Sequence, residues 1–176
     1  MATIAALTFA SAAIAQDRSF SEYGVKAAFL FNLPDFVIWP DSPQDPSTLT
    51  LCVVGEDPFG AALSFFEGKR VKGRTLRIVR LSAEAPLPRC EILFICKSVT
   101  DQTRRILEPI ANSPVLTVSD GREFTRNGGV VALLVVGDQV QLEINVSAAS
   151  AAGLSISSKL LEIARVVDFR PVQVPR

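Results

Sequence analysis

Apolar and polar residues follow two different patterns toward the C-terminus. Residues 130–136 are apolar at every position, which is typical of a strand covered on both faces. Residues 140–145 alternate at period two, with Glu143 and Asn145 on the polar side, which predicts a strand with one solvated face. The intervening Gly137-Asp138-Gln139 is short and supplies a residue that tolerates positive φ. These residues therefore predict an antiparallel hairpin.

A helical period follows this hairpin. Apolar residues recur on one side of a turn of about 3.6 residues, and polar residues occupy the other side. This pattern predicts an amphipathic helix over residues 156–167 that lies on the sheet. Its apolar positions are Ile156, Leu160, Leu161, Ile163, Ala164 and Val167.

Before the hairpin, apolar runs of strand length alternate with helical patterns. This alternation indicates right-handed βαβ crossovers, and the length of 176 residues suits one domain with a substantial core. The expected fold is a single α/β domain whose central sheet is mostly parallel and flanked by helices, with the antiparallel hairpin near the C-terminus. The expected strands are 49–54, 76–81, 92–95 and 115–120, with 76–81 near an edge, and the expected helices are 59–66 and 100–112.

The first helix of this domain is expected to follow Ser19 and Glu22, which have the spacing of a capping box. Residues 23–31 are strongly apolar, and Pro34 should end or kink the helix. A short extended run is expected at residues 36–40, before a loop rich in Pro, Ser and Asp.

Residues 1–15 are predicted to be a secretory signal. They are small or apolar, carry no charge and end in Ala13-Ile14-Ala15 before a polar pair. The stretch is shorter than the ~18 continuous apolar residues that a membrane span requires. The alternative is a buried N-terminal helix. We expect cleavage near Ala15 and export of residues 16–176 as one domain, without direct membrane insertion.

Composition excludes several kinds of chemistry. The 18 basic and 18 acidic residues cancel, so nucleic-acid binding is not expected. The chain has no histidine, and thus lacks the commonest general base and the commonest neutral metal ligand. We expect no catalytic, cofactor-binding or metal-binding residues, and the protein is not expected to be an enzyme.

Four short motifs resemble functional sites but lack essential residues. Gly55 and Gly60 have the glycine spacing of a phosphate loop, but alanines stand where Lys and Ser/Thr are required. Gly128-Gly129 lacks the dinucleotide-binding pattern, and Gly153-Leu154-Ser155 lacks the second glycine of a nucleophile elbow. Glu56-Asp57 follows a strand, where acidic residues also favour the start of a helix. We interpret all four as turns or helix starts.

The three cysteines allow one disulfide and one free thiol in an oxidising compartment. Cys90 and Cys96 bracket one extended strand and would lie on the order of 20 Å apart, whereas bridged Cα atoms lie within about 7 Å. Cys52 is therefore one partner, and the residues alone leave the other open.

Several motifs occur in order along nearly the whole mature chain. They are residues 25–32 (VKAAFLFN), 36–40 (FVIWP), 51–60 (LCVVGEDPFG), 90–95 (CEILFI), 116–120 (LTVSD), and 143–145 (EIN) with 152–161 (AGLSISSKLL). Together they resemble the YfiR family of bacterial periplasmic proteins. The resemblance implies a non-enzymatic negative regulator that binds the periplasmic part of an inner-membrane diguanylate cyclase and inhibits it, lowering cyclic-di-GMP and biofilm formation. It also implies a Cys52–Cys90 disulfide and a homodimer.

The expected partner surface lies on the first-helix segment. Phe29, Phe31, Phe36 and Trp39 supply more aromatic surface than one helix needs for its core packing, and aromatic residues dominate protein interfaces. The alternative is that all four belong to the core. A second functional hypothesis is a periplasmic small-molecule sensor or carrier, because α/β sheets offer a crevice at the carboxyl ends of their strands.

Overall fold

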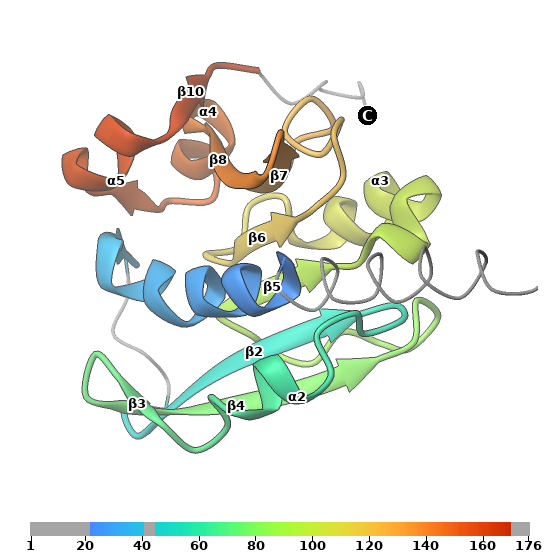
Figure 1. Ribbon diagram of the computed structural model, residues 1–176, viewed down its shortest axis with the longest axis vertical. Coiled ribbons are helices and arrows are strands. Elements are labelled where there is room, and N and C mark those ends of the chain that lie inside the picture. Colours follow the sequence, from blue (N-terminus) through green and yellow to red (C-terminus); the bar gives the residue numbers. More distant parts are fainter. Residues whose placement is uncertain (1–21, 41–44, 170–176) are drawn as a thin grey trace, which may run out of the picture.

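Eight strands form one curled sheet in the computed structural model, which describes residues 22–40 and 45–169 (Figure 1). Neighbouring strands run parallel except at the β3–β4 and β7–β8 pairs. This is the expected α/β fold with a mostly parallel sheet. The order across the sheet is β10 (Arg165–Val167), β8 (Gln139–Asn145), β7 (Val131–Val136), β6 (Leu116–Ser119), β5 (Ile92–Ile95), β2 (Thr48–Val54), β4 (Arg74–Leu81) and β3 (Arg70–Val71).

Helices cover both faces of the sheet. The first face packs against helix 22–32, the 3-10 turn η1 (Leu33–Phe36), α2 (Ala61–Ser64), α4 (Val146–Ala151) and α5 (Ser158–Ile163). The second face packs against α3 (Thr103–Leu107), which lies between the 3-10 turns η2 (Lys97–Gln102) and η3 (Glu108–Ile110). A small antiparallel sheet joins β1 (Val37–Ile38) to β9 (Ser155–Ile156).

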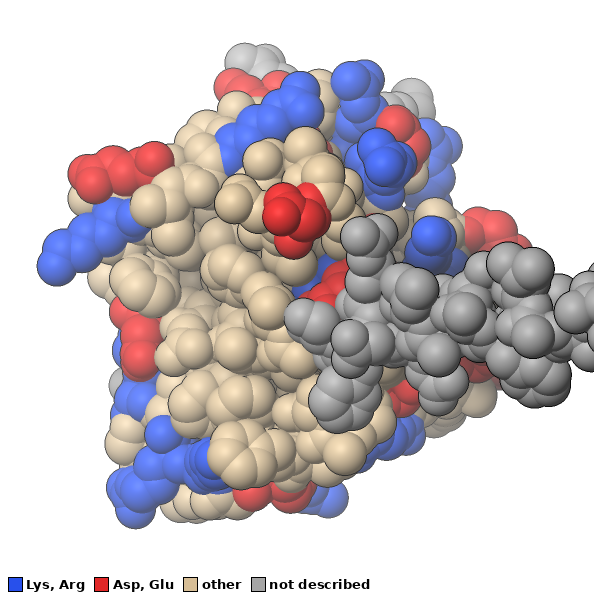
Figure 2. Space-filling view, in the orientation of Figure 1, with Lys and Arg blue, Asp and Glu red and all other residues tan. Residues whose placement is uncertain are grey.

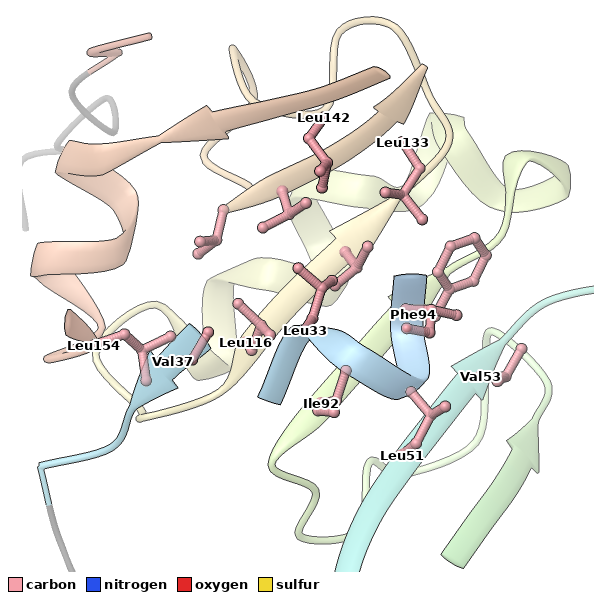
Figure 3. Close-up of a cluster of buried hydrophobic side chains, with 14 of the residues drawn as sticks. Leu33, Val37, Leu51, Val53, Ile92, Phe94, Leu116, Leu133, Leu142 and Leu154 are labelled. Atoms are coloured by element: carbon pink, nitrogen blue, oxygen red, sulfur yellow. The ribbon is translucent and has the colours of Figure 1, made fainter. Parts of the chain in front are cut away.

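The larger core lies between helix 22–32 and the first face of the sheet (Figure 3). Leu33 lies among Leu51, Ile92 and Phe94 from the central strands, and each of the four is at most 1% exposed. Full burial of one such apolar side chain contributes about 1.5–3 kcal/mol to the free energy of folding. Ala27 and Leu30 of the first helix are fully buried in the same core, so the inner side of this helix and η1 are both fixed to the sheet by apolar packing.

The predicted C-terminal hairpin is confirmed. β7 and β8 pair antiparallel with Leu133 opposite Leu142, and a turn at Gly137 and Asp138 joins them. Gly137 has φ +66°, a left-handed conformation that glycine adopts without strain.

The prediction that one face of β8 meets solvent is wrong at its C-terminal end. Glu143 is 6% exposed and Asn145 is fully buried. Glu143 accepts a hydrogen bond from Thr125, while the Asn145 amide donates to the Thr125 carbonyl at 2.9 Å and to the Phe169 carbonyl at 2.8 Å. Segments distant in sequence thus cover polar residues that the alternation places in water.

The helix predicted over residues 156–167 is also wrong in extent. Ile156 belongs to β9, where it pairs with Val37, and Val167 belongs to β10. Only α5 is helical, and Ile163 at its end is 69% exposed. Strand pairing with remote segments therefore overrides the local helical period.

Two other predicted helices are shorter than their sequence patterns. The pattern over residues 59–66 yields only the four residues of α2, followed by turns. The pattern over 100–112 divides into α3 and the flanking 3-10 turns, and Pro109 lies at the start of η3. The first helix ends before Pro34 as predicted, because η1 begins at Leu33.

Candidate functional site

The outward side of helix 22–32 is an uncharged strip. Val25, Ala28 and Asn32 share this side because they recur at three- and four-residue spacing, and Val25 is 44% exposed. Lys26 is the one charged residue between positions 23 and 32, and it points inward at 2% exposure. Figure 2 shows the result as a broad tan area with charged side chains mainly around its margins.

Two of the predicted partner residues border this strip. Phe29 and Phe31 are about 200° apart around the helix, so they lie on opposite flanks of the outward line. Both are half-buried and pack against the core, and Phe31 stacks on Phe66 with ring centroids 4.5 Å apart. Each ring thus combines a structural contact with exposed aromatic surface. We call the surface formed by Val25, Ala28, Phe29, Phe31 and Asn32 the helix strip.

The other two predicted partner residues follow the helix. Phe36 ends η1 and Trp39 follows β1, and both are half-buried against the core. The Lys72 ammonium lies 5.8 Å from the centroid of the Trp39 ring. These two aromatic residues therefore belong to the segment that follows the helix, near the β3–β4 hairpin. They extend the aromatic surface away from the helix strip.

A buried polar cluster holds helix 22–32 to the carboxyl end of β6. Tyr23 donates a hydrogen bond of 2.7 Å from its hydroxyl to Asp120, which follows β6. The Lys26 ammonium lies 3.2 Å from the same carboxylate oxygen and also pairs with Glu22. Asp120 and Lys26 are both at least nine-tenths buried. Removing one partner of a buried pair costs about 3–5 kcal/mol, so the cluster fixes the position of the helix.

Burial and the charge of Asp120 raise the pKa values of two nearby groups, Tyr23 and Cys96. Burial, the hydrogen bond to Asp120 and the negative charge of Asp120 all raise the pKa of Tyr23 above its ordinary value. Burial and the same charge raise the pKa of the Cys96 thiol to about 12. Both groups are therefore protonated at neutral pH, and the Cys96 thiol is not activated as a nucleophile.

The disulfide joins Cys52 in β2 to Cys90 before β5, which is the pairing that the resemblance implies. Their Cα atoms are 6.0 Å apart, and Cys96 is buried as a free thiol. Because Cys52 lies opposite Leu93 in the parallel β2–β5 pair, the bridge ties β2 to the segment that leads into β5. It connects two neighbouring strands at the centre of the sheet.

The structure places the glycines of the discarded motifs in or beside turns, and Ser155 in a short strand. Gly55 turns the chain after β2 with φ +101°, and a Cβ there would lie 2.7 Å from the Ser98 hydroxyl. A Cβ on Gly129 would meet the Phe124 ring at 2.1 Å, so this glycine allows close packing. Ser155 is exposed in β9 opposite Ile38. Gly55 and Gly129 therefore have structural roles, in turning the chain and in close packing.

The crevice that the sensor hypothesis requires is present but small. A hollow of about 440 Å³ lies beyond the carboxyl ends of β2, β4 and β5, and its lining includes Glu56, Arg80 and Gln102. The Arg80 guanidinium is 2.6 Å from Asp57, so this charge is already paired. A larger groove lies at the opposite, amino-terminal edge of the sheet.

Within residues 22–40 and 45–169, no group of three or more Cys, Asp or Glu side chains is placed to hold a metal ion. In the same part of the chain, every helix is too short or too polar to cross a membrane.

The fold and the site define a one-domain α/β protein with a disulfide in its sheet and an uncharged helix surface. A family model described as YfiR/HmsC-like matches residues 23–165, which is most of the chain. The protein therefore belongs to the YfiR/HmsC-like family. This family consists of periplasmic regulatory proteins of diguanylate cyclase signalling.

Sequence reasoning missed the residues that hold the first helix in place. Lys26 and Asp120 appear only as members of motifs, although a lysine inside an apolar helix and an aspartate ending a buried strand are both informative positions. Their pairing is not visible in the sequence because 94 positions separate them.

Proposed function

We propose that the protein is a non-enzymatic periplasmic repressor that binds the periplasmic portion of an inner-membrane diguanylate cyclase and holds the cyclase inactive. The family match over residues 23–165 is the observation that carries this proposal. Binding then lowers cyclic-di-GMP and biofilm formation, and the protein itself performs no chemistry.

The helix strip, together with Phe36 and Trp39, is the proposed contact surface. It combines exposed apolar area with half-buried aromatic rings, and aromatic residues contribute disproportionately to binding energy. The strip carries no charge that would have to be desolvated on binding. The Tyr23–Lys26–Asp120 cluster holds the helix rigid, which reduces the entropy lost on binding.

A pair of valine substitutions tests this surface. Val25 on the helix strip is 44% exposed, and Val136 at the end of β7 is 50% exposed, so Val25→Arg and Val136→Arg introduce the same charge at similar exposure. We expect Val25→Arg to reduce recovery of the cyclase at least tenfold in a pull-down from detergent-solubilised membranes, and Val136→Arg to leave recovery unchanged. Equal recovery with both variants would remove the helix strip from the proposal.

Export and self-association are further parts of the proposal. We propose that residues 1–15 are removed and that the mature chain is a homodimer, in line with its apolar first helix. N-terminal sequencing of protein from the periplasm tests cleavage near Ala15. Light scattering at micromolar concentration tests the dimer, and a purely monomeric mass would contradict it.

A second candidate function is the small-molecule sensor or carrier. The larger groove at the amino-terminal edge of the sheet favours it, because its volume of about 920 Å³ lies within the range of known ligand sites. Binding of a small molecule there is compatible with a regulator whose partner is a protein.

A further inference from the structure

The groove runs along the amino-terminal ends of β2, β4 and β5. We call it the amino-edge groove, and its defining side chains are Trp39, Lys72, Arg74, Arg89, Leu93 and Val115. It borders the Cys52–Cys90 disulfide, because Cys90 also lines it. It therefore lies at the opposite edge of the sheet from the crevice that α/β proteins ordinarily use.

One part of the amino-edge groove is apolar. Leu93 forms its floor at 1% exposure, and the half-buried Ile110 and Val115 line it on the face of the sheet that carries α3. Leu87 adds a further half-buried wall. A hydrocarbon chain or an aromatic ring placed there would bury apolar surface on several sides, which contributes about 25 cal/mol for each Å².

The charged side chains of the groove leave an excess of positive charge. Arg74 forms an ion pair with Glu91. The Asp45 carboxylate accepts hydrogen bonds from Ser47 and Thr48, which lower its pKa to about 2.

Two cations at the groove remain without a carboxylate among the described residues. The Lys72 ammonium donates a hydrogen bond of 2.8 Å to the neutral carbonyl of Val37. Arg89 is exposed and forms no ion pair within residues 22–40 and 45–169. Asp45 offsets one of these two cations, so the groove keeps one net positive charge and favours a single anionic group.

Two buried donors beside these cations have no acceptor. The indole Nε1 of Trp39 and the Nε of Arg74 are both buried, and neither has a hydrogen-bond partner in the described part of the chain. A buried donor without an acceptor costs about 1–3 kcal/mol. Trp39 lies near Lys72, at 5.8 Å from ring centroid to ammonium, so one unused donor and one unpaired charge occur at the same end of the groove.

We propose that the amino-edge groove binds a small anionic amphiphile, a carboxylic acid with an apolar body such as a medium-chain fatty acid. The acid group lies at the Lys72 and Trp39 end, and the apolar body lies along Leu93, Ile110 and Val115. This inference does not depend on the proposed cyclase partner, because it rests on the groove alone.

The tryptophan of the groove reports binding directly, because Trp39 is the single tryptophan of the chain. The test titrates the full mature protein with decanoate and with decanol and follows tryptophan emission. We expect a saturable change with decanoate, and about tenfold weaker binding of the neutral alcohol.

Charge variants separate a built site from nonspecific adsorption. Lys72→Gln combined with Arg89→Gln should weaken decanoate binding about tenfold and leave decanol binding unchanged, since an exposed ion pair contributes only up to about 1 kcal/mol. Arg104→Gln on α3 removes a charge outside the groove and should change neither affinity. Melting curves of all variants confirm that they are folded, as expected for exposed side chains.

Three results would overturn the proposal. Equal affinity for decanoate and decanol would show that charge plays no part. Full decanoate affinity in the double variant would place the acid elsewhere, and an emission change that does not saturate would indicate adsorption rather than a site.

Discussion

Opening the Cys52–Cys90 disulfide should destabilise the protein by about 4 kcal/mol. The bridge closes a loop with a sequence separation of 38, and the chain-entropy model assigns about this free energy to a loop of that length. A total unfolding free energy of about 5–15 kcal/mol makes the loss substantial. Cys90→Ser is the suitable variant because Cys90 is half-buried, whereas Cys52 is fully buried and tolerates less change.

The assay is thermal and urea unfolding of the wild type, the reduced wild type and Cys90→Ser. We expect both altered proteins to melt roughly 8–16 °C lower, at about 2–4 °C for each kcal/mol in a chain of this size. The proposed repression of the cyclase should weaken as well, because less folded protein is present. Cys96→Ala is the control, since it removes a buried thiol outside the bridge and should cost only about 1 kcal/mol.

Two results would refute this reasoning. A Cys90→Ser variant within about 1 kcal/mol of the wild type would show that the bridge does not restrict the unfolded chain as the entropy model requires. A peptide that links Cys52 to Cys96 in mass spectrometry of the non-reduced protein would show a different pairing.

Three further predictions concern buried polar groups. Asp120→Asn removes the charge that faces Lys26 and should cost about 3 kcal/mol in urea unfolding, and an unchanged midpoint would contradict a structural role for the pair. Tyr23 is the single tyrosine, so absorbance at alkaline pH should show it ionising above its ordinary pKa of 10.0. Because folding raises this pKa, the contribution of Tyr23 to stability is complete below pH 10.0, the pKa of the unfolded chain. This contribution is lost as the pH rises through the higher pKa of the folded protein. Asp120→Asn should move this titration to lower pH, and a tyrosine that titrates at its ordinary value in both proteins would contradict the hydrogen bond. Asn145→Ala removes the side chain that accepts the Ala148 N–H at the start of α4 and should cost about 2 kcal/mol in urea unfolding. An unfolding free energy within about 0.5 kcal/mol of the wild type would mean that water replaces the hydrogen bonds of Asn145.

The sequence predicted the elements that depend on local patterns. The continuous apolar run at β5 is typical of a buried parallel strand, and β5 lies inside the sheet between β6 and β2. The hairpin between β7 and β8 could also be predicted, because the strand period and the turn residues both indicate a hairpin there. Local and tertiary preferences coincide at these elements.

Elements whose conformation depends on remote pairing could not be predicted in this way. Ile156 satisfies a helical period and a strand equally well, and its pairing with Val37 selects the strand. Glu143 and Asn145 alternate with apolar residues, as solvated positions do. In the structure both are buried, because Thr125 donates a hydrogen bond to Glu143 and Asn145 donates one to the Phe169 carbonyl. A single sequence carries no signal for such partners.

The candidate site also has a part that could be predicted from the sequence and a part that could not. The aromatic residues of the first-helix segment are visible in the sequence, and their half-buried positions are known only from the packing. The amino-edge groove is assembled from segments spread between Ile38 and Val115, so no short motif marks it.

The bond between Tyr23 and Asp120 spans 97 positions, and this separation determines when the first helix can take its place. The ribosome makes residues 22–39 well before the strands and Asp120 that supply their apolar and polar partners. Until then the apolar inner side and the helix strip are both open to water, and an exposed apolar segment of this kind tends to aggregate. Folding should therefore be slow, because the contacts that hold the first helix are remote in sequence.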